Sequence, residues 1–290
     1  MVENKTLDPA AVRLAWRVTE PLHSVVYFVP ESAERFTALG ITGGDGYFCS
    51  RAAPLGAVGP GPVTAMFYNF NPELIARVLP SAWERVTPAA VLAARLAAVD
   101  AALTRGLGKD VLDGPEVAEA AVLARRAAES AAPYADGRPL YAAHAELPWP
   151  VEPHLVLWHA QTLLREFRGD GHVAALLVAG VSGLESMILH VASGETDETF
   201  LRKTRGWHRP QWQAAVDGLR ERGLIEGGPP VLTGAGRQLR AGVEATTDRL
   251  GTAPYLVLGA EGCARLAELT RPLSRLIVKG GLLNPMNSVA

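Results

Sequence analysis

The stretch from His154 to His172 carries the side chains best suited to chemistry. Up to Phe167 its apolar residues recur with a helical period of about 100° per residue and fall on one arc. The opposite arc holds two imidazoles, an indole, a hydroxyl and an Arg/Glu couple but no lysine: His154, Trp158, His159, Gln161, Thr162, Arg165 and Glu166. This polar arc predicts the wall of a ligand pocket. The alternative is an exposed helix face that happens to hold His and Trp.

Acid–base catalysis is one use of such groups. His159 and Glu166 lie on one helix face about 10 Å apart along the axis, which suits a ligand between them better than a direct dyad. Asp170 stands close enough to His172 in the sequence to orient its imidazole. An enzyme built here would use His159 or His172 as general base, with Glu166 or Asp170 as the partner. Arg165 and Glu166 are adjacent, so we do not expect them to face each other.

Binding of a small aromatic or anionic ligand is the second use. Arg165 or Arg168 would pair with an anionic group, while Trp158 and two tyrosines would supply the apolar walls. His154 and Thr162 would complete this side of the pocket. Several polar residues of the first half are set among apolar ones and could face the same cavity: His23, Tyr27, Tyr47, Arg51, Tyr68 and Asn69. In the alternative interpretation these side chains satisfy one another inside a core.

The histidines also raise the question of a metal or haem. His154 and His159 are five residues apart, about 140° around a helix, unlike the i, i+4 pair of a zinc site. The chain has no Cys-x-x-Cys, which disfavours a structural zinc. We therefore predict no metal and no other cofactor. A single axial histidine for haem stays open at four positions, although a structural role is the more common one: His154, His159, His172 and His190.

Composition limits the class of protein. Of 290 residues, 48% are hydrophobic and 20% charged, so a substantial core is expected. A net charge of −2 does not suggest a protein that coats nucleic acid or anionic membrane. Two cysteines cannot form a disulfide framework. No apolar signal segment is found near the first residue, and the longest apolar run, within 173–184, is too short to span a bilayer. We expect a cytoplasmic protein without a membrane partner.

The elements that must position these side chains are mostly helical. Apolar periodicity predicts helices over 9–17, 19–39, 72–84, 88–106 and 114–132, and again over 154–167. The aromatic and β-branched runs 47–51 and 63–70 are interpreted as short strands or extended segments. Arg168-Gly169-Asp170-Gly171 is expected to break the central helix. The proline-marked link 147–153 is the predicted boundary between domains 1–147 and 148–290.

The order of elements after residue 208 carries a family resemblance. A helix is predicted over 209–222, a Gly-Gly-Pro-Pro hairpin tip over 227–230, and a long helix over 238–250 that continues in 260–277. The run LRERGLIEGGPPVLTGAGRQL resembles the recognition helix, wing and following helix of MarR-type winged-helix proteins, a likeness that covers 196–250. The whole chain also resembles a poorly characterised actinobacterial group of tandem winged-helix proteins.

Weak internal similarity extends this resemblance to the first half. Pro72-Glu73-Leu74-Ile75 aligns with Pro153-His154-Leu155-Val156, and 136–147 aligns with 228–239. We therefore predict a mainly α fold with small β-wings, in which two pseudo-repeated winged-helix units form a single-chain pseudo-dimer. The first unit is degenerate, and 19–39 packs against 238–269. Chance similarity among Ala-rich helices is the alternative.

A winged helix implies DNA as a partner. Arg209, Gln211 and Gln213 at the start of the predicted recognition helix could contact base edges. Residues 196–250 contain nine Lys/Arg and seven Asp/Glu, a small positive excess, so a scaffold that has lost DNA binding is the alternative. The leading hypothesis is a winged-helix protein that binds a small molecule in a pocket between its units and regulates transcription, as a monomer or a homodimer. The competing hypotheses are an enzyme on the same scaffold and a haem-binding protein.

Overall fold

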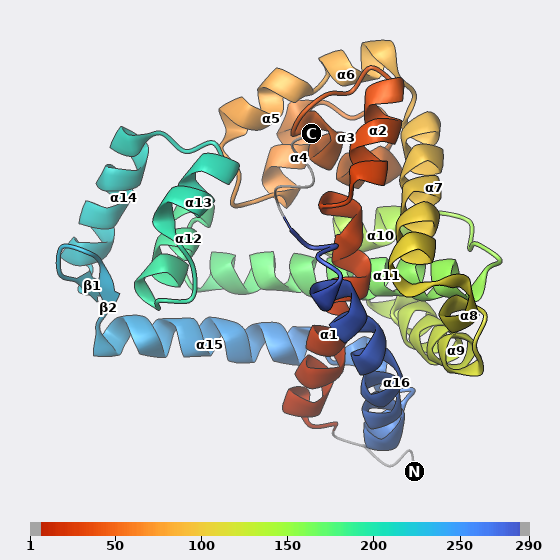
Figure 1. Cartoon of the computed structure of the whole chain (residues 1–290). Helices are drawn as coiled ribbons and strands as arrows, with labels where there is room; N and C mark the ends of the chain where they lie inside the picture. The colour runs from red at the N-terminus through yellow and green to blue at the C-terminus, as the bar shows by residue number, and fades with distance from the viewer. Residues whose placement is uncertain (1–6, 285–290) are drawn as a thin grey trace. The chain divides into compact units, whose positions relative to one another are not determined.

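The computed structural model describes residues 7–284, and its regular structure is mainly helical (Figure 1). The described chain divides into two compact units. Unit 1 holds the residues up to 57, residues 81–170 and those from 248 onward, whereas unit 2 holds 58–80 and 171–247. Each unit draws on both sequence halves, so these units differ from the predicted domains 1–147 and 148–290.

The regular structure of unit 1 consists entirely of helices among its described residues. Its elements are α1 (Pro9–Ser24), η1 (Val25–Tyr27), α2 (Pro30–Ala38), α3 (Asp45–Ala52), η2 (Ala53–Leu55), α6 (Ser81–Arg85), α7 (Pro88–Leu107), α8 (Lys109–Leu112), α9 (Pro115–Ser130), η3 (Ala132–Tyr134), α10 (Pro139–Ala145), η4 (Ala253–Tyr255) and α16 (Gly259–Lys279). It also takes the first part of α11 (Pro153–Val178) and the end of α15 (Gly234–Leu250). Many helices begin with proline, whose fixed φ suits the first turn. Side chains also cap some of these helices: at the start of α1 the Asp8 carboxylate accepts from the Ala10 amide at 2.9 Å.

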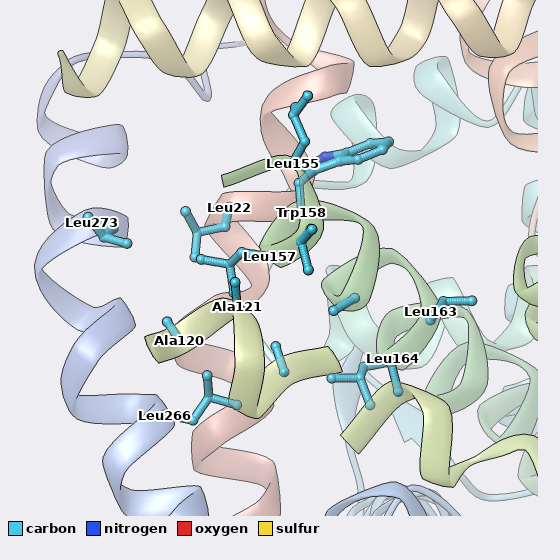
Figure 2. Close-up of a cluster of buried hydrophobic side chains, with 14 of the residues drawn as sticks. Leu22, Ala120, Ala121, Leu155, Leu157, Trp158, Leu163, Leu164, Leu266 and Leu273 are labelled. Carbon is cyan, nitrogen blue, oxygen red and sulfur yellow. The ribbon is translucent and has the colours of Figure 1, made fainter. Parts of the chain in front are cut away.

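The core of unit 1 forms where α1, α9, α11 and α16 meet (Figure 2). It contains the buried side chains of Leu22, Ala120, Ala121, Leu155, Leu157, Trp158, Leu163, Leu164, Leu266 and Leu273. Alanines on α9 leave room for the larger residues of α11. Helices α1 and α16 pack along each other, and Ser274 Oγ donates to the Val18 carbonyl at 2.6 Å. The predicted packing of 19–39 against 238–269 is met in part: α1, which includes residues 19–24, packs on α16, whereas α2 packs against α7.

Unit 2 contains the predicted helix and wing. Its elements are α4 (Pro60–Met66), α5 (Pro72–Val78), the end of α11, α12 (Gly183–Ala192), α13 (Glu198–Thr204), α14 (Arg209–Glu221), β1 (Ile225–Glu226), β2 (Val231–Leu232) and most of α15. The strands pair antiparallel, with Ile225 opposite Leu232. Gly227 makes the turn with a φ of +79°. Trp212 and Val216 of α14 are buried with Ile225 in the unit's core. The predicted helix and small wing are therefore confirmed.

Residues 58–80, which we call the α4–α5 segment, are an integral part of unit 2. Gly183 packs so closely on this segment that an added Cβ would lie 1.8 Å from the Tyr68 carbonyl oxygen. The Asn71 amide donates to the Arg205 carbonyl at 2.9 Å, and the Asn71 side chain donates to the Gly206 carbonyl at 2.9 Å. Trp207 Nε1 donates to the Asn69 carbonyl at 2.9 Å. The segment thus holds the turn between α13 and α14, and we call these three bonds the clamp.

The expectation of strands at 47–51 and 63–70 is wrong. These runs lie mainly in α3 and α4. Of the buried residues in the second run, Val63 lies inside α4, Phe67 is the C-cap of that helix and Phe70 lies in the turn that follows. Their β-branched and aromatic character suggested strands, but this local preference is weak and packing overrides it.

The expected break at 168–171 is also absent, because α11 runs unbroken from Pro153 to Val178. Two glycines inside a helix cost stability, yet residues at the start of α10 bind this turn. The Asp170 carboxylate accepts from the Tyr141 amide at 3.0 Å. Arg138 donates to the Phe167 carbonyl. The pseudo-repeat between the two halves stays a prediction.

Candidate functional site

A buried ion network in unit 1 gathers most of the residues predicted to line a pocket. At its centre Glu166 is held by Arg51, whose Nη2 lies 2.7 Å from Oε2 and whose Nε lies 3.2 Å from Oε1. Arg165 Nη1 donates to Glu166 Oε1 at 3.1 Å, and its Nε donates to Glu20 Oε1 at 2.9 Å. The expectation that Arg165 and Glu166 do not face each other is wrong, because the long arginine side chain reaches back to its neighbour.

Aromatic side chains border this network. His23 contacts Thr162 Oγ1 through Nδ1 and the Tyr27 hydroxyl through Nε2, each at 2.9 Å, and its ring stacks on Trp158. The rings of Tyr27 and Tyr47 lie 5.0 Å apart, centroid to centroid. The Tyr47 hydroxyl accepts from Arg51 Nη1 at 2.9 Å. The structure therefore brings together eight predicted residues: His23, Tyr27, Tyr47, Arg51, Trp158, Thr162, Arg165 and Glu166.

The electrostatics of the network fix its protonation. Burial alone would raise the pKa of Glu166, but Arg51 and Arg165 overcome this effect and hold that pKa well below its usual range. Burial, reinforced by Arg165, lowers the pKa of His23 well below that of free histidine. At neutral pH the site therefore presents an ionised carboxylate between two guanidinium groups and a neutral imidazole. Such a Glu166 accepts hydrogen bonds and does not donate a proton.

Two members of this region are absent from the sequence interpretation. Arg95 of α7 is buried, donates to the Ser50 carbonyl at 2.7 Å and lies 3.3 Å from His144 Nε2. Burial and Arg95 lower the pKa of His144 to about 3. A signal for Arg95 existed, because it occupies the buried face of an Ala-rich helix between Val91 and Ala98. His144 had no comparable signal.

The other predicted residues of unit 1 have separate partners. His154 Nε2 lies 2.8 Å from Asp100 Oδ1. Arg168 pairs with Asp248 at 2.8 Å and covers the Trp16 ring. His159 packs edge-on against Trp149, and burial together with Arg95 and Arg125 lowers its pKa to about 4. The predicted general base is thus neutral and packed against an indole. In unit 2, His172 Nδ1 and His190 Nδ1 contact Thr247 Oγ1 and Arg240 Nη2, respectively.

Asp170 supplies a pH-dependent contribution to stability. Burial raises its pKa from 3.8 to about 7, against the opposing effect of the hydrogen bond from the Tyr141 amide. Folding favours the neutral carboxyl. The contribution of Asp170 to the free energy of unfolding is therefore complete below about pH 4 and is lost as the pH rises through about 7. We expect Asp170→Asn to lose less stability than the native chain between pH 5 and pH 8, measured by chemical denaturation. The exposed Asp110→Asn is the control, and equal pH profiles for native chain and Asp170→Asn would refute the assignment.

The start of α14 forms the second candidate surface. Arg209 and Gln213 are exposed there, and Gln213 Nε2 donates to Asp217 Oδ1 at 2.9 Å. Gln211 is half-buried, and its Oε1 accepts from the His208 amide at 3.1 Å and from Asn71 Nδ2 at 3.3 Å. Of the three predicted base-reading residues, two therefore point outward while Gln211 closes the start of the helix.

Charge on unit 2 is balanced. Its residues include nine Lys/Arg and nine Asp/Glu. The wing tip carries Glu226 and two prolines but no basic residue. Arg220 and Arg222 pair with Asp217 and Glu185. The start of α14 is therefore exposed as a DNA-reading helix is, but its surroundings lack the positive charge that usually neutralises phosphates.

Among residues 7–284, no group of three or more His, Cys, Asp or Glu side chains could hold a metal ion. Within the same range no single helix is long and apolar enough to cross a membrane. The model of a helix-turn-helix family matches residues 12–284. Comparison with curated proteins and with solved structures gives no match.

Proposed function

Because the chain belongs to a helix-turn-helix family, we propose that it is a cytoplasmic transcriptional regulator that reads duplex DNA with α14. The observation that carries the proposal is the exposed start of α14, held from behind by the clamp. Arg209 and Gln213 face solvent, while Trp212 anchors the same turns in the core. Base edges are read by such outward side chains on a helix whose backbone is fixed.

The balanced charge of unit 2 limits how DNA is bound. Phosphate neutralisation supplies most non-specific affinity, and few unpaired cations are available here. Binding then depends on a small number of base contacts together with Arg209 and the exposed Lys203 of α13. We expect weak binding to unrelated DNA and a shallow dependence on salt, with a slope of about −0.9 per phosphate contact.

The test is a double substitution. Arg209→Ala together with Gln213→Ala should abolish the gel retardation of DNA from upstream of the protein's own gene. Two lost base contacts correspond to about 100-fold weaker binding. Arg126→Ala, which removes an exposed charge from α9 in unit 1, is the control and should bind as the native chain does. Absence of any retardation by the native chain at low salt would contradict the proposal.

A further inference from the structure

Unit 2 contains a partly open cavity that DNA reading by α14 does not use. Its volume is about 280 Å³, and its walls come from the end of α11, from α12, from the end of α13 and from α15, with Asn69 of the α4–α5 segment at one side. This volume matches the smallest ligand pockets and suits a ligand of a single ring or a short chain.

The lining has two parts of different chemistry. The floor is apolar and buried: Leu176, Val181, Met187, Leu189, Leu201 and Val243. The rim is polar and half-buried, and it includes His190, Arg205 and Arg240 together with the carboxylate of Glu244. An apolar floor with two guanidinium groups and one carboxylate at the rim fits a molecule that has an apolar body and one negative group.

Arg240 is the residue of the rim best placed to take an anion. Its Nη2 makes two contacts, to His190 Nδ1 and to Glu195 Oε2, each at 3.2 Å. Glu195 is 59% exposed, so water screens this ion pair and a ligand carboxylate can replace it. Burial, together with Arg240, lowers the pKa of His190, which keeps the imidazole neutral beside the guanidinium.

The cavity shares two wall residues with the clamp. The Arg205 carbonyl accepts from the Asn71 amide, and the Asn69 carbonyl accepts from Trp207 Nε1. Both bonds hold the turn that leads into α14. A ligand that moves Asn69 or Arg205 therefore also moves the start of α14. Ligand binding can change DNA affinity only if the ligand favours one position of α14 over another.

We propose that this cavity binds a small monoanion with an apolar body, such as an arylalkanoate or a medium-chain carboxylate. Its carboxylate pairs with Arg240, its body lies on the floor, and its binding alters DNA affinity through the clamp. The regulatory part rests on the DNA-binding function proposed above, whereas the binding part stands without it.

Calorimetry on the full chain tests the site itself. The probes are 3-phenylpropionate, hexanoate and the neutral 3-phenylpropionamide. At least one carboxylate should bind saturably at one site per chain, and the amide should bind about tenfold more weakly or worse. Arg240→Gln should weaken the carboxylate by a similar factor, and Leu239→Trp should abolish binding by filling the cavity. Arg249→Gln, an exposed arginine on the same helix, should change nothing.

Each outcome decides one part of the proposal. The site is refuted if neither carboxylate binds at concentrations up to about 10 mM, or if binding is unaffected by both Arg240→Gln and Leu239→Trp. Thermal unfolding of the variants shows that they are folded. Retardation of DNA with and without the bound carboxylate tests the coupling: a shift in DNA affinity that Arg240→Gln removes supports it. Ligand binding with unchanged DNA affinity refutes the coupling alone, and ligand binding without any DNA binding refutes the proposed function but not the site.

Discussion

Replacing Glu166 by Ala should lower the free energy of unfolding by about 3–5 kcal/mol, because it leaves the Arg51 and Arg165 guanidinium groups in a buried site without their shared carboxylate. Removing one partner of a buried pair costs far more than the pair itself contributes. Glu166→Gln should be less damaging, since its amide oxygen still accepts from one arginine. Chemical denaturation at pH 7 measures both variants.

An exposed ion pair provides the matched control for this prediction. Arg125 and Glu129 pair at 2.7 Å on α9, with both side chains more than 40% exposed. Glu129→Ala should therefore stay within about 0.5 kcal/mol of the native chain. If Glu166→Ala behaves like Glu129→Ala, the ion network around Glu166 is solvated in solution and is not buried as described.

Removal of residues 1–40 should give a product that aggregates or unfolds without cooperativity. The deletion removes α1 and α2 and uncovers apolar side chains of α16 and α7, including Leu266 and Leu273. The newly exposed patch would far exceed the few hundred Å² that soluble monomers tolerate. Size-exclusion chromatography and thermal unfolding report the outcome. A monomeric truncation with a sharp transition would show that the first helices are peripheral.

Two single substitutions on α1 keep this prediction quantitative if the truncation cannot be purified. Leu22 is 3% exposed and should cost about 2–5 kcal/mol when replaced by Ala. Leu14, on the same helix, is 49% exposed, so Leu14→Ala should be nearly neutral. Equal effects of the two changes would contradict the packing of α1 described here.

Local signals in the sequence were sufficient to predict the two-stranded wing. Gly227, Gly228 and two prolines punctuate two short β-branched runs, and this turn chemistry acts over a few residues. Helix spacing was equally informative for α7, α9 and α14. Local patterns misled at 47–51 and 63–70, where aromatic residues satisfied both a strand and a helix pattern, and at 168–171, where two glycines suggested a break inside α11.

The candidate site depended on contacts that no local pattern records. Glu166 and Arg51 were both among the residues predicted to line a pocket, and the structure pairs them with each other. The choice of Arg51 was not predictable, since 115 residues separate the two. The same reason explains why Asn71 was missed, although it holds the turn before α14. Its partners Arg205 and Gly206 lie far along the chain, and a single Asn before Pro72 signals only a helix cap.

The interleaving of the two units also sets an order of events during synthesis on the ribosome. The α4–α5 segment leaves the exit tunnel long before residues 171–247. Its apolar residues therefore stay unpacked until the rest of unit 2 has been synthesised. Unit 2 has all its segments once residue 247 has emerged, whereas unit 1 still lacks α16, which covers α1. The nascent chain therefore has all segments of unit 2 before it has those of the larger unit 1. Closing contacts over such long loops is slow, which makes the final step the one most exposed to chaperones and proteases.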